Sequence, residues 1–179
     1  EEFCKQVLQK FNIAKPYVLS VGKNEPRKNM QNLVKAFASL NSTTHELVIV
    51  GPQGWGNQVT SIGRVSDPEL FALYQKAKAF VMPSLYEGFG FPLLEAMSLG
   101  CLTACSNSSS LLEIAGGASL LFDPLDENDI TKTLDKIIFH KEDYTGLIQK
   151  GIERAKEFQW NKTASKIISV VGAWSSRPN

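Results

Sequence analysis

Short apolar runs alternate with longer stretches of helical periodicity along this chain. Six runs of four or five mostly apolar residues predict buried strands, at 17–21, 47–50, 59–62, 79–82, 102–105 and 119–122. The stretches between them carry apolar residues three and four positions apart, as in the helix predicted from Met30 to Leu40. Strands that are apolar throughout and separated by helices are typical of a parallel sheet covered on both faces. The pattern therefore predicts an α/β fold with an open, doubly wound, mostly parallel sheet.

The two ends of the chain carry amphipathic helical patterns. Residues 1–15 mix charged and apolar positions as a surface helix does, and three helical stripes follow from Asn128 to the end. There is no internal repeat and no low-complexity linker between these segments. We therefore expect residues 1–179 to form one domain in which C-terminal helices follow the sheet.

Local signals refine the expected helix boundaries. Asp67, which precedes a proline, is the expected N-cap of the helix after the third strand. Pro92 is expected to begin the next helix, and Gly100 to end it. The serine run 106–110 is expected to cap a short helix at 111–115, with substrate contact as the less favoured alternative.

The connection between the second and third strands is unusually short. A parallel crossover ordinarily needs a dozen or more residues, whereas only the stretch 54–58 follows the turn after the second strand. Either a helix is reduced to a turn here, or a stretch of chain is missing between Gly56 and Asn57. The abrupt junction favours the second explanation.

Charge and hydropathy narrow the classes of function. Lysine and arginine total 19 against 18 acidic residues, which gives a formal net charge of +1. This balance provides no basic field for nucleic acid, and no apolar run is long enough to cross a bilayer. We expect a cytoplasmic protein that does not bind nucleic acid.

The cysteines and tryptophans carry no evident chemistry. Three cysteines are an odd number without zinc-ligand spacing, so we expect reduced core residues. The three tryptophans, Trp55, Trp160 and Trp174, are expected to pack rather than to stack on a base.

The loop after the first strand concentrates positive charge. Lys23, Arg27 and Lys28 follow the strand-ending Gly22 and precede a helix. A helix N-terminus favours an anion, and cations beside it would strengthen the binding of phosphate. The alternative is a solvated charged turn. No GxGxxG or GxxxxGK pattern follows Gly22, so a dinucleotide fingerprint or a P-loop is not indicated.

The loop after the fourth strand holds two carboxylates eight positions apart. Glu87 lies in a glycine-rich turn, and Glu95 is expected in the first turn of the next helix. Glycines let the backbone approach a ligand, and the helix start can hold a phosphate between two acceptors of hydroxyl groups. The alternative is structural: Glu95 would complement the helix dipole and Glu87 would cap the turn.

The segment from Glu87 to Glu95 resembles the E-x7-E signature of GT-B-fold glycosyltransferases, family 4 (group 1) in particular. Further agreement follows the chain in order: a basic loop and helix at 17–37, "LVIVG" and "GxxGW" at 47–55, "GxVSD" at 63–67, and an "FSWxxTA"-like entry to the last helix at 158–164. The resemblance implies the Rossmann-like, donor-binding half of a retaining enzyme of this family.

The resemblance also implies roles for particular residues. Glu87 would be the catalytic residue, as nucleophile or electrostatic stabiliser, and Glu95 would bind the ribose of the donor. The remaining implied donor contacts are Lys23, Arg27, Lys28, Arg64, Val65, Gly88, Phe89, Gly90 and Phe91. Lys23 stands where the family ordinarily has an arginine. Since there is no DxD pair, the resemblance implies diphosphate binding without a metal and without any cofactor beyond the nucleotide sugar.

The family further implies partners outside this chain. Its acceptor domain precedes the donor domain and is absent here, so this chain alone is expected to be inactive in transfer. The donor would be GDP-mannose, with UDP-sugars next, and the acceptor a sugar or a lipid-linked sugar, with possible peripheral membrane association of the full-length protein. Two alternatives remain open: a GT-B-fold epimerase or phosphorylase, and a non-catalytic nucleotide-binding module.

Overall fold

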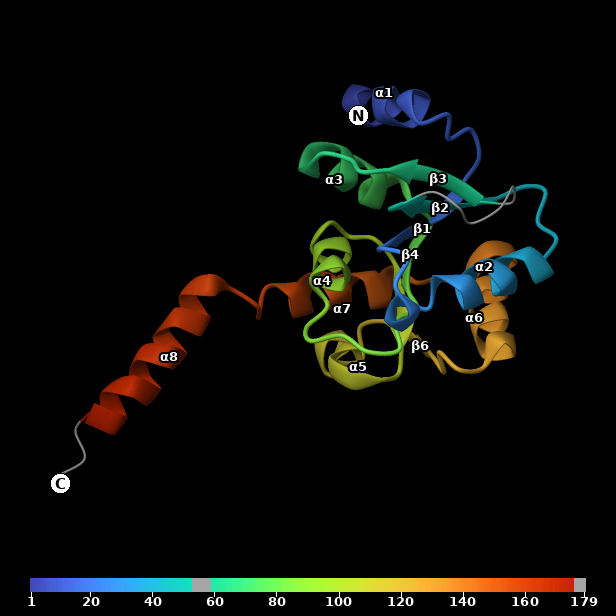
Figure 1. Cartoon of the computed structure of the whole chain (residues 1–179). Coiled ribbons are helices and arrows are strands. Elements are labelled where there is room, and N and C mark those ends of the chain that lie inside the picture. The colour runs from blue at the N-terminus through green and yellow to red at the C-terminus, as the bar shows by residue number, and fades with distance from the viewer. Residues whose placement is uncertain (53–58, 176–179) are drawn as a thin grey trace.

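The computed structural model describes residues 1–52 and 59–175 (Figure 1). Six strands form one sheet in the order β3-β2-β1-β4-β5-β6, and every pair is parallel. The strands are β1 (Tyr17–Val21), β2 (Glu46–Val50), β3 (Val59–Gly63), β4 (Ala79–Met82), β5 (Thr103–Ser106) and β6 (Leu120–Phe122). The predicted α/β, doubly wound parallel sheet is confirmed.

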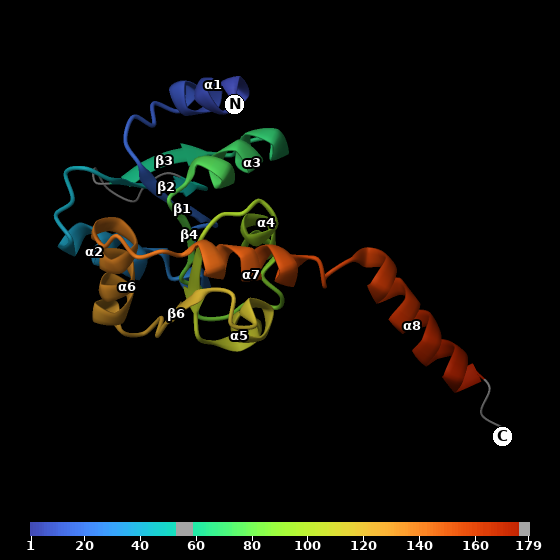
Figure 2. The ribbon, with the colours of Figure 1, turned by 180° about the vertical axis from the view of Figure 1, so that it is seen from behind.

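Helices cover both faces of the sheet (Figure 2). They are α1 (Glu2–Lys10), α2 (Met30–Ser39), α3 (Asp67–Lys76), α4 (Phe91–Ser98), α5 (Ser109–Ala115), α6 (Glu127–Phe139), α7 (Thr145–Ala155) and α8 (Trp160–Ser175), with a 3₁₀ turn at Pro26–Lys28. One face is covered by α1, α3, α4 and α5, and the other by α2 and α6.

Alternation along the strands divides the core into these two layers. On β1, Leu19 faces the layer of α3 and α4, whereas Val18 faces the layer of α2 and α6. Both side chains are fully buried, as are their counterparts Phe80 and Ala79 on β4. Burial on both faces explains why these strands read as continuous apolar runs and not as alternating ones.

Strand boundaries follow the sequence pattern to within a residue, whereas α5 begins two residues earlier than expected and α1 ends at Lys10. The N-cap of α3 also differs. Ser66, and not Asp67, is the N-cap of α3. The N–H and the hydroxyl of Ser66 both donate to the carboxylate of Glu69. The helix therefore begins with its N-cap one residue earlier than predicted, with Glu69 as the acceptor for the N-cap N–H. β5 likewise lies one residue later than expected and ends at Ser106.

Two predictions from the sequence concern the connection between β2 and β3: its short length and the packing of Trp55. These strands are parallel neighbours, and residues 53–58 between them lie outside the described part of the chain. The short stretch 54–58, and with it Trp55, is therefore not described.

All three cysteines are free and buried, as the sequence predicts. Burial raises the pKa of the Cys101 thiol to about 12 and that of Cys105 to about 11. Since the thiolate is the reactive form, these side chains behave as small apolar core residues.

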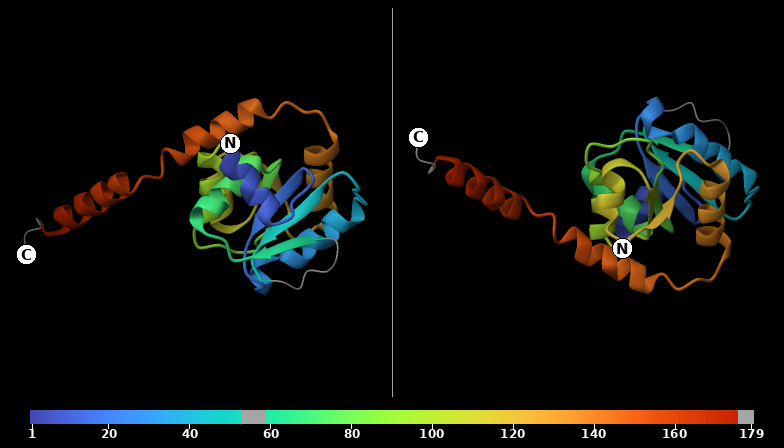
Figure 3. Two further views of the ribbon diagram at one scale, coloured as in Figure 1. Left: turned by 90° about the horizontal axis from the view of Figure 1, so that it is seen from above. Right: turned by 90° about the horizontal axis from the view of Figure 1, so that it is seen from below.

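The last helix leaves the body of the protein. Figure 3 shows α8 extending away from the sheet and from the other helices, seen from above and from below. Its apolar side chains at Ile167, Ile168, Val170 and Val171 are exposed. Trp160, the first residue of α8, is 79% exposed and packs against the exposed ring of Phe91. Within residues 1–52 and 59–175, no helix is long and apolar enough to span a membrane.

Asn29 ties three loops together at the carboxyl edge of the sheet. It adopts the left-handed backbone conformation (φ 55°) between the 3₁₀ turn and α2. Its buried side-chain amide donates to the carbonyl of Pro83, after β4, at 3.1 Å and to that of Pro124, after β6, at 2.8 Å. The basic loop, the Glu87 loop and the loop before α6 are therefore fixed relative to one another.

We predict that removing the side chain of Asn29 lowers the free energy of unfolding. Asn29→Gly keeps the backbone conformation accessible but leaves two buried carbonyls without donors, so the free energy of unfolding should fall by about 1–3 kcal/mol. Asn29→Ala should cost about 1 kcal/mol more, because alanine is strained in the left-handed region. Urea unfolding followed by circular dichroism measures both. A glycine variant as stable as the parent would show that the bridge contributes nothing.

Candidate functional site

The basic loop and the Glu87 loop meet because β1 and β4 are neighbours in the sheet. Carboxyl ends of parallel strands lie at one edge, so the segments that follow these two strands are side by side. Their backbones are joined directly: the N–H of Leu85 donates to the carbonyl of Arg27 at 2.8 Å. Residues 60 positions apart in the chain can therefore share one site.

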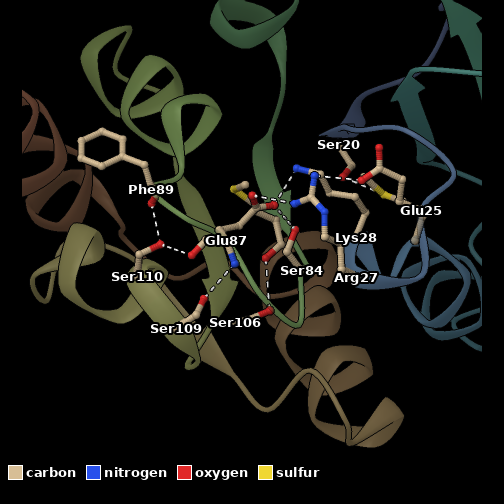
Figure 4. A network of polar contacts seen from close by, with 12 residues as sticks. Ser20, Glu25, Arg27, Lys28, Ser84, Glu87, Phe89, Ser106, Ser109 and Ser110 are labelled. Atoms are coloured by element: carbon tan, nitrogen blue, oxygen red, sulfur yellow. Dashed lines mark hydrogen bonds and ion pairs between the residues drawn. The ribbon is translucent and has the colours of Figure 1, made fainter.

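The carboxylate of Glu87 is the centre of this site (Figure 4). Lys28 Nζ lies 2.6 Å from Oε1, and Arg27 donates to Oε2 at 3.2 Å. The Ser84 hydroxyl donates to Oε1 at 2.7 Å. Glu87 is only 8% exposed, so its negative charge is shielded from water and balanced by the two cations.

Arg27 is shared between two carboxylates. It also pairs with Glu25 at 2.8 Å, and its side chain is half exposed, whereas Lys28 is largely buried. Two cations and two carboxylates thus sit together with no net charge. An anion that entered this site would compete with Glu87 for Lys28 and Arg27.

Free backbone amides lie next to this carboxylate. In the described chain, the N–H groups of Gly88, Phe89, Gly90 and Phe91 donate to no protein acceptor. These four amides lead into α4, where the helix dipole also favours an anion. Gly90 has a φ of 116° and packs on Leu111, so a side chain is excluded there; nothing lies within 4 Å of a Cβ placed on Gly88.

Glu95 lies on α4 and, within the part of the chain that the structure describes, shares none of the hydrogen-bond partners of Glu87. It is the fifth residue of α4, so the expectation that it falls in the first turn is wrong: the helix begins at Phe91. The hydroxyl of Tyr74, on α3, donates to its carboxylate at 3.2 Å. Burial, and then the charge of Glu95, raise the pKa of Tyr74, which keeps the phenol protonated as a donor.

Glu95 borders a mainly apolar cavity of about 530 Å³ between α4 and the start of α8. Phe91 and Trp160 form its rim, with their rings 6.5 Å apart and near parallel. Both side chains are exposed.

The larger cavity, about 600 Å³, lies at the opposite edge of the sheet. Glu46 dominates its polar lining, but its carboxylate already accepts from the N–H groups of Ala14 and Lys15 and from the Thr60 hydroxyl. These bonds fix the entry of β1 against β2 and β3. We therefore place the functional site at the carboxyl edge, where cations and amides are open to a ligand.

Three of the predicted donor-binding residues form no hydrogen bond or ion pair with Glu87 or its partners in the described ranges, 1–52 and 59–175. Lys23 is exposed at the start of the basic loop and, within the described residues, makes no ion pair. Arg64 is exposed after β3, and Val65 packs partly on the core. These two residues lie between β3 and the start of α3.

Sequence patterns missed several residues that hold the site. Ser84 donates to the Glu87 carboxylate, and Tyr74 to that of Glu95. Ser108 is the N-cap of α5 but makes no side-chain cap bond, and the hydroxyls of Ser108–Ser110 contact the Glu87 loop instead. The expected helix cap is therefore wrong in its contacts. The one available signal was a dense serine run after a strand predicted to lie near the fourth.

Two bacterial mannosyltransferases are similar to this chain in sequence. It is 35% identical to the O-antigen chain mannosyltransferase B of Escherichia coli, over 93% of this chain and 48% of that protein. It is 31% identical to the serotype-specific mannosyltransferase WbdA of the same species, over 93% of this chain and 23% of that protein. The chain thus spans half or less of the length of these relatives.

Solved structures share its fold. A sucrose-phosphate synthase from Thermosynechococcus elongatus superposes with a TM-score of 0.81 at 24% identity, covering 96% of this chain and 49% of that one. The C-terminal domain of a glycosyl transferase group 1 family protein (LpcC) from Francisella tularensis gives 0.71 at 21% identity, covering 88% and 93%. The second match is to a domain solved by itself.

The family assignment comes from the sequence. The family model "Glycosyl transferases group 1" matches residues 6–154, which include both glutamates and the basic loop. The resemblance that the E-x7-E segment indicates is confirmed, together with the GT-B fold of the neighbours. This chain belongs to the group 1 glycosyl transferases.

Proposed function

We propose that this chain is the donor-binding domain of a retaining glycosyltransferase that takes a hexose from a nucleoside diphosphate. One observation carries the proposal: Lys28 and Arg27 converge on Glu87 beside the free amides that lead into α4. Cations and amides are what a departing diphosphate requires, and a carboxylate is what a sugar hydroxyl or a cationic anomeric carbon requires.

The roles follow from charge. When the bond between the anomeric carbon and the diphosphate breaks, the electron pair moves to the phosphate oxygen. Lys28, Arg27 and the Gly88–Phe91 amides stabilise that oxygen without a metal ion, and Lys23 adds charge at the mouth of the loop. Glu87, freed from its cations, faces the sugar as nucleophile or electrostatic stabiliser.

The nucleoside would lie on the α3 side of the edge. Glu95, oriented by Tyr74, accepts hydrogen bonds from the ribose hydroxyls. Arg64 and Val65 border the base. Phe91 and Phe89, whose ring centroids are 4.7 Å apart, close the apolar side of this path.

Of the candidate sugars we propose mannose, with GDP-mannose as the donor. Both relatives described above bear the name of mannosyltransferases. A UDP-sugar is the alternative donor, since nothing at the edge of the sheet distinguishes the bases by a side-chain contact among the described residues.

The complete enzyme would include a second domain that binds a sugar or lipid-linked acceptor. This chain spans 48% of the length of one mannosyltransferase. Alignment of an acceptor with the anomeric carbon contributes on the order of 7–11 kcal/mol to lowering a barrier. The chain alone therefore binds donor without transferring sugar, and peripheral membrane association would belong to the complete protein.

We expect this chain to bind GDP or UDP saturably at one site, with affinity unchanged by EDTA. Calorimetric titration with each nucleotide, with and without the chelator, measures this. If the chain bound neither nucleotide, the proposal would be contradicted. An epimerase-like or non-catalytic role would then remain. A loss of binding in EDTA would contradict the metal-independent site.

Replacing Lys28 should weaken diphosphate binding selectively. Lys28→Met keeps the apolar stem but leaves Glu87 paired with Arg27 alone, so the site repels an anion. We expect a loss of roughly 10- to 100-fold for the nucleoside diphosphate, smaller in high salt, and little change for the nucleoside. Lys23→Met, at an exposed cation of the same loop, is the matched control and should lose much less. Equal losses for nucleotide and nucleoside would place Lys28 away from the diphosphate.

Replacing Glu95 should affect ribose recognition without unfolding the domain. Glu95→Ala removes a charge-assisted acceptor, so the affinity for the ribonucleotide should fall about tenfold or more. The 2′-deoxynucleotide should lose less, because it lacks one of the hydroxyls. Calorimetry and thermal melting of the same variant separate the two effects, with the exposed Glu113→Ala as control. A large drop in melting temperature with unchanged affinity would make Glu95 structural.

A further inference from the structure

Three consecutive serines at the start of α5 contact the backbone of the Glu87 loop. The hydroxyl of Ser108 donates to the carbonyl of Leu85 at 3.1 Å. The hydroxyl of Ser109 accepts from the N–H of Glu87 at 3.1 Å. The segment between β4 and α4 has no regular structure, so these side chains supply the partners that a helix or sheet would otherwise provide.

Ser110 holds two carbonyls of this loop at once. Its hydroxyl lies 2.8 Å from the carbonyl oxygen of Glu87 and 2.9 Å from that of Phe89, so a single proton is shared between them (Figure 4). Both carbonyls therefore point toward α5. This shared hydrogen bond constrains the peptides that follow the two carbonyls.

Because each peptide is planar, the direction of its carbonyl also determines the direction of the N–H in the same peptide. The carbonyl of Glu87 and the N–H of Gly88 belong to one planar trans peptide, so they point in opposite directions. The same holds for the carbonyl of Phe89 and the N–H of Gly90. Because the Ser110 hydroxyl holds both carbonyls, the Gly88 and Gly90 N–H groups each point away from that hydroxyl. Neither has an acceptor in the described chain, although Gly90 is buried.

The backbone at Ser109 is held in a costly conformation. Its φ is +52°, in the left-handed region that a residue with a Cβ rarely adopts. Such strain persists where surrounding contacts impose it. Here the conformation accompanies the acceptor that Ser109 provides to the N–H of Glu87, the residue whose carboxylate meets Lys28.

We propose that Ser109 and Ser110 are positioning residues for donor binding: they hold the Glu87 and Phe89 backbone so that the Gly88 and Gly90 amides face the anionic oxygens of the donor. They do not touch the donor themselves. This assignment rests on the proposed function for the identity of the donor, but the orientation of the amides is a property of the chain that inorganic pyrophosphate can probe.

The test is a titration of the ¹⁵N-labelled chain with pyrophosphate, followed at the amide resonances of Gly88 and Gly90. We expect both to shift in the parent chain and in Ser110→Thr, which keeps the hydroxyl. In Ser110→Ala the affinity should fall about tenfold, the equivalent of roughly one hydrogen bond in each of the two reoriented peptides. Ser39→Ala is the matched control, since that hydroxyl also donates to a backbone carbonyl at 2.8 Å, far from the site.

The outcomes are distinct. Amides of Gly88 and Gly90 that do not respond to pyrophosphate in the parent chain overturn the inference, and that measurement requires no variant to fold. Equal affinity of Ser110→Ala and the parent overturns it as well, as does an equal loss in Ser39→Ala. A pyrophosphate response that depends on Ser110, in a chain that binds neither GDP nor UDP, supports the positioning role and contradicts the proposed donor.

Discussion

The buried ion pair between Lys28 and Glu87 depends on one feature of the topology, the adjacency of β1 and β4. A carboxylate and an ammonium that both leave water lose hydration, and only close geometry with additional hydrogen bonds offsets that cost. Arg27, Ser84 and the bridge through Asn29 supply those additional contacts. The two cations and two carboxylates at this edge leave it without net charge.

The neutrality also determines what a ligand has to do. In the proposed function, a nucleoside alone would offer no anion to Lys28 and Arg27 and would leave their pairing with Glu87 intact. A diphosphate would compete with Glu87 for both cations, with the amides that lead into α4 as further donors. Because Glu87 is buried, losing its cations is costly, and the exchange would be favourable only if the ligand also supplied hydrogen-bond donors to the carboxylate.

Support for this edge comes from both layers of helices. Asn29, at the start of α2, belongs to one face of the sheet, and the serines of α5 belong to the other. Between them lies the irregular segment that carries Glu87 and the glycines. Regular secondary structure would have consumed the amides of Gly88 and Gly90 in its own hydrogen bonds. An irregular loop fixed by side chains leaves them available, which is the physical advantage of the arrangement.

The sequence by itself determined the strand and helix order, the parallel sheet and the two loops that carry charge. Buried strands and amphipathic helices have local periodicities, and the E-x7-E segment is contiguous, so both are visible without coordinates. Only the tertiary structure decided that Lys28 and Arg27 converge on Glu87, that Glu95 is oriented by Tyr74 from α3, and that serines expected to cap α5 hold the Glu87 loop. The pairs and bridges concerned join residues 21 to 60 positions apart. A hydrogen bond of that kind depends on strand order and helix packing, and neither has a periodic signature in the sequence.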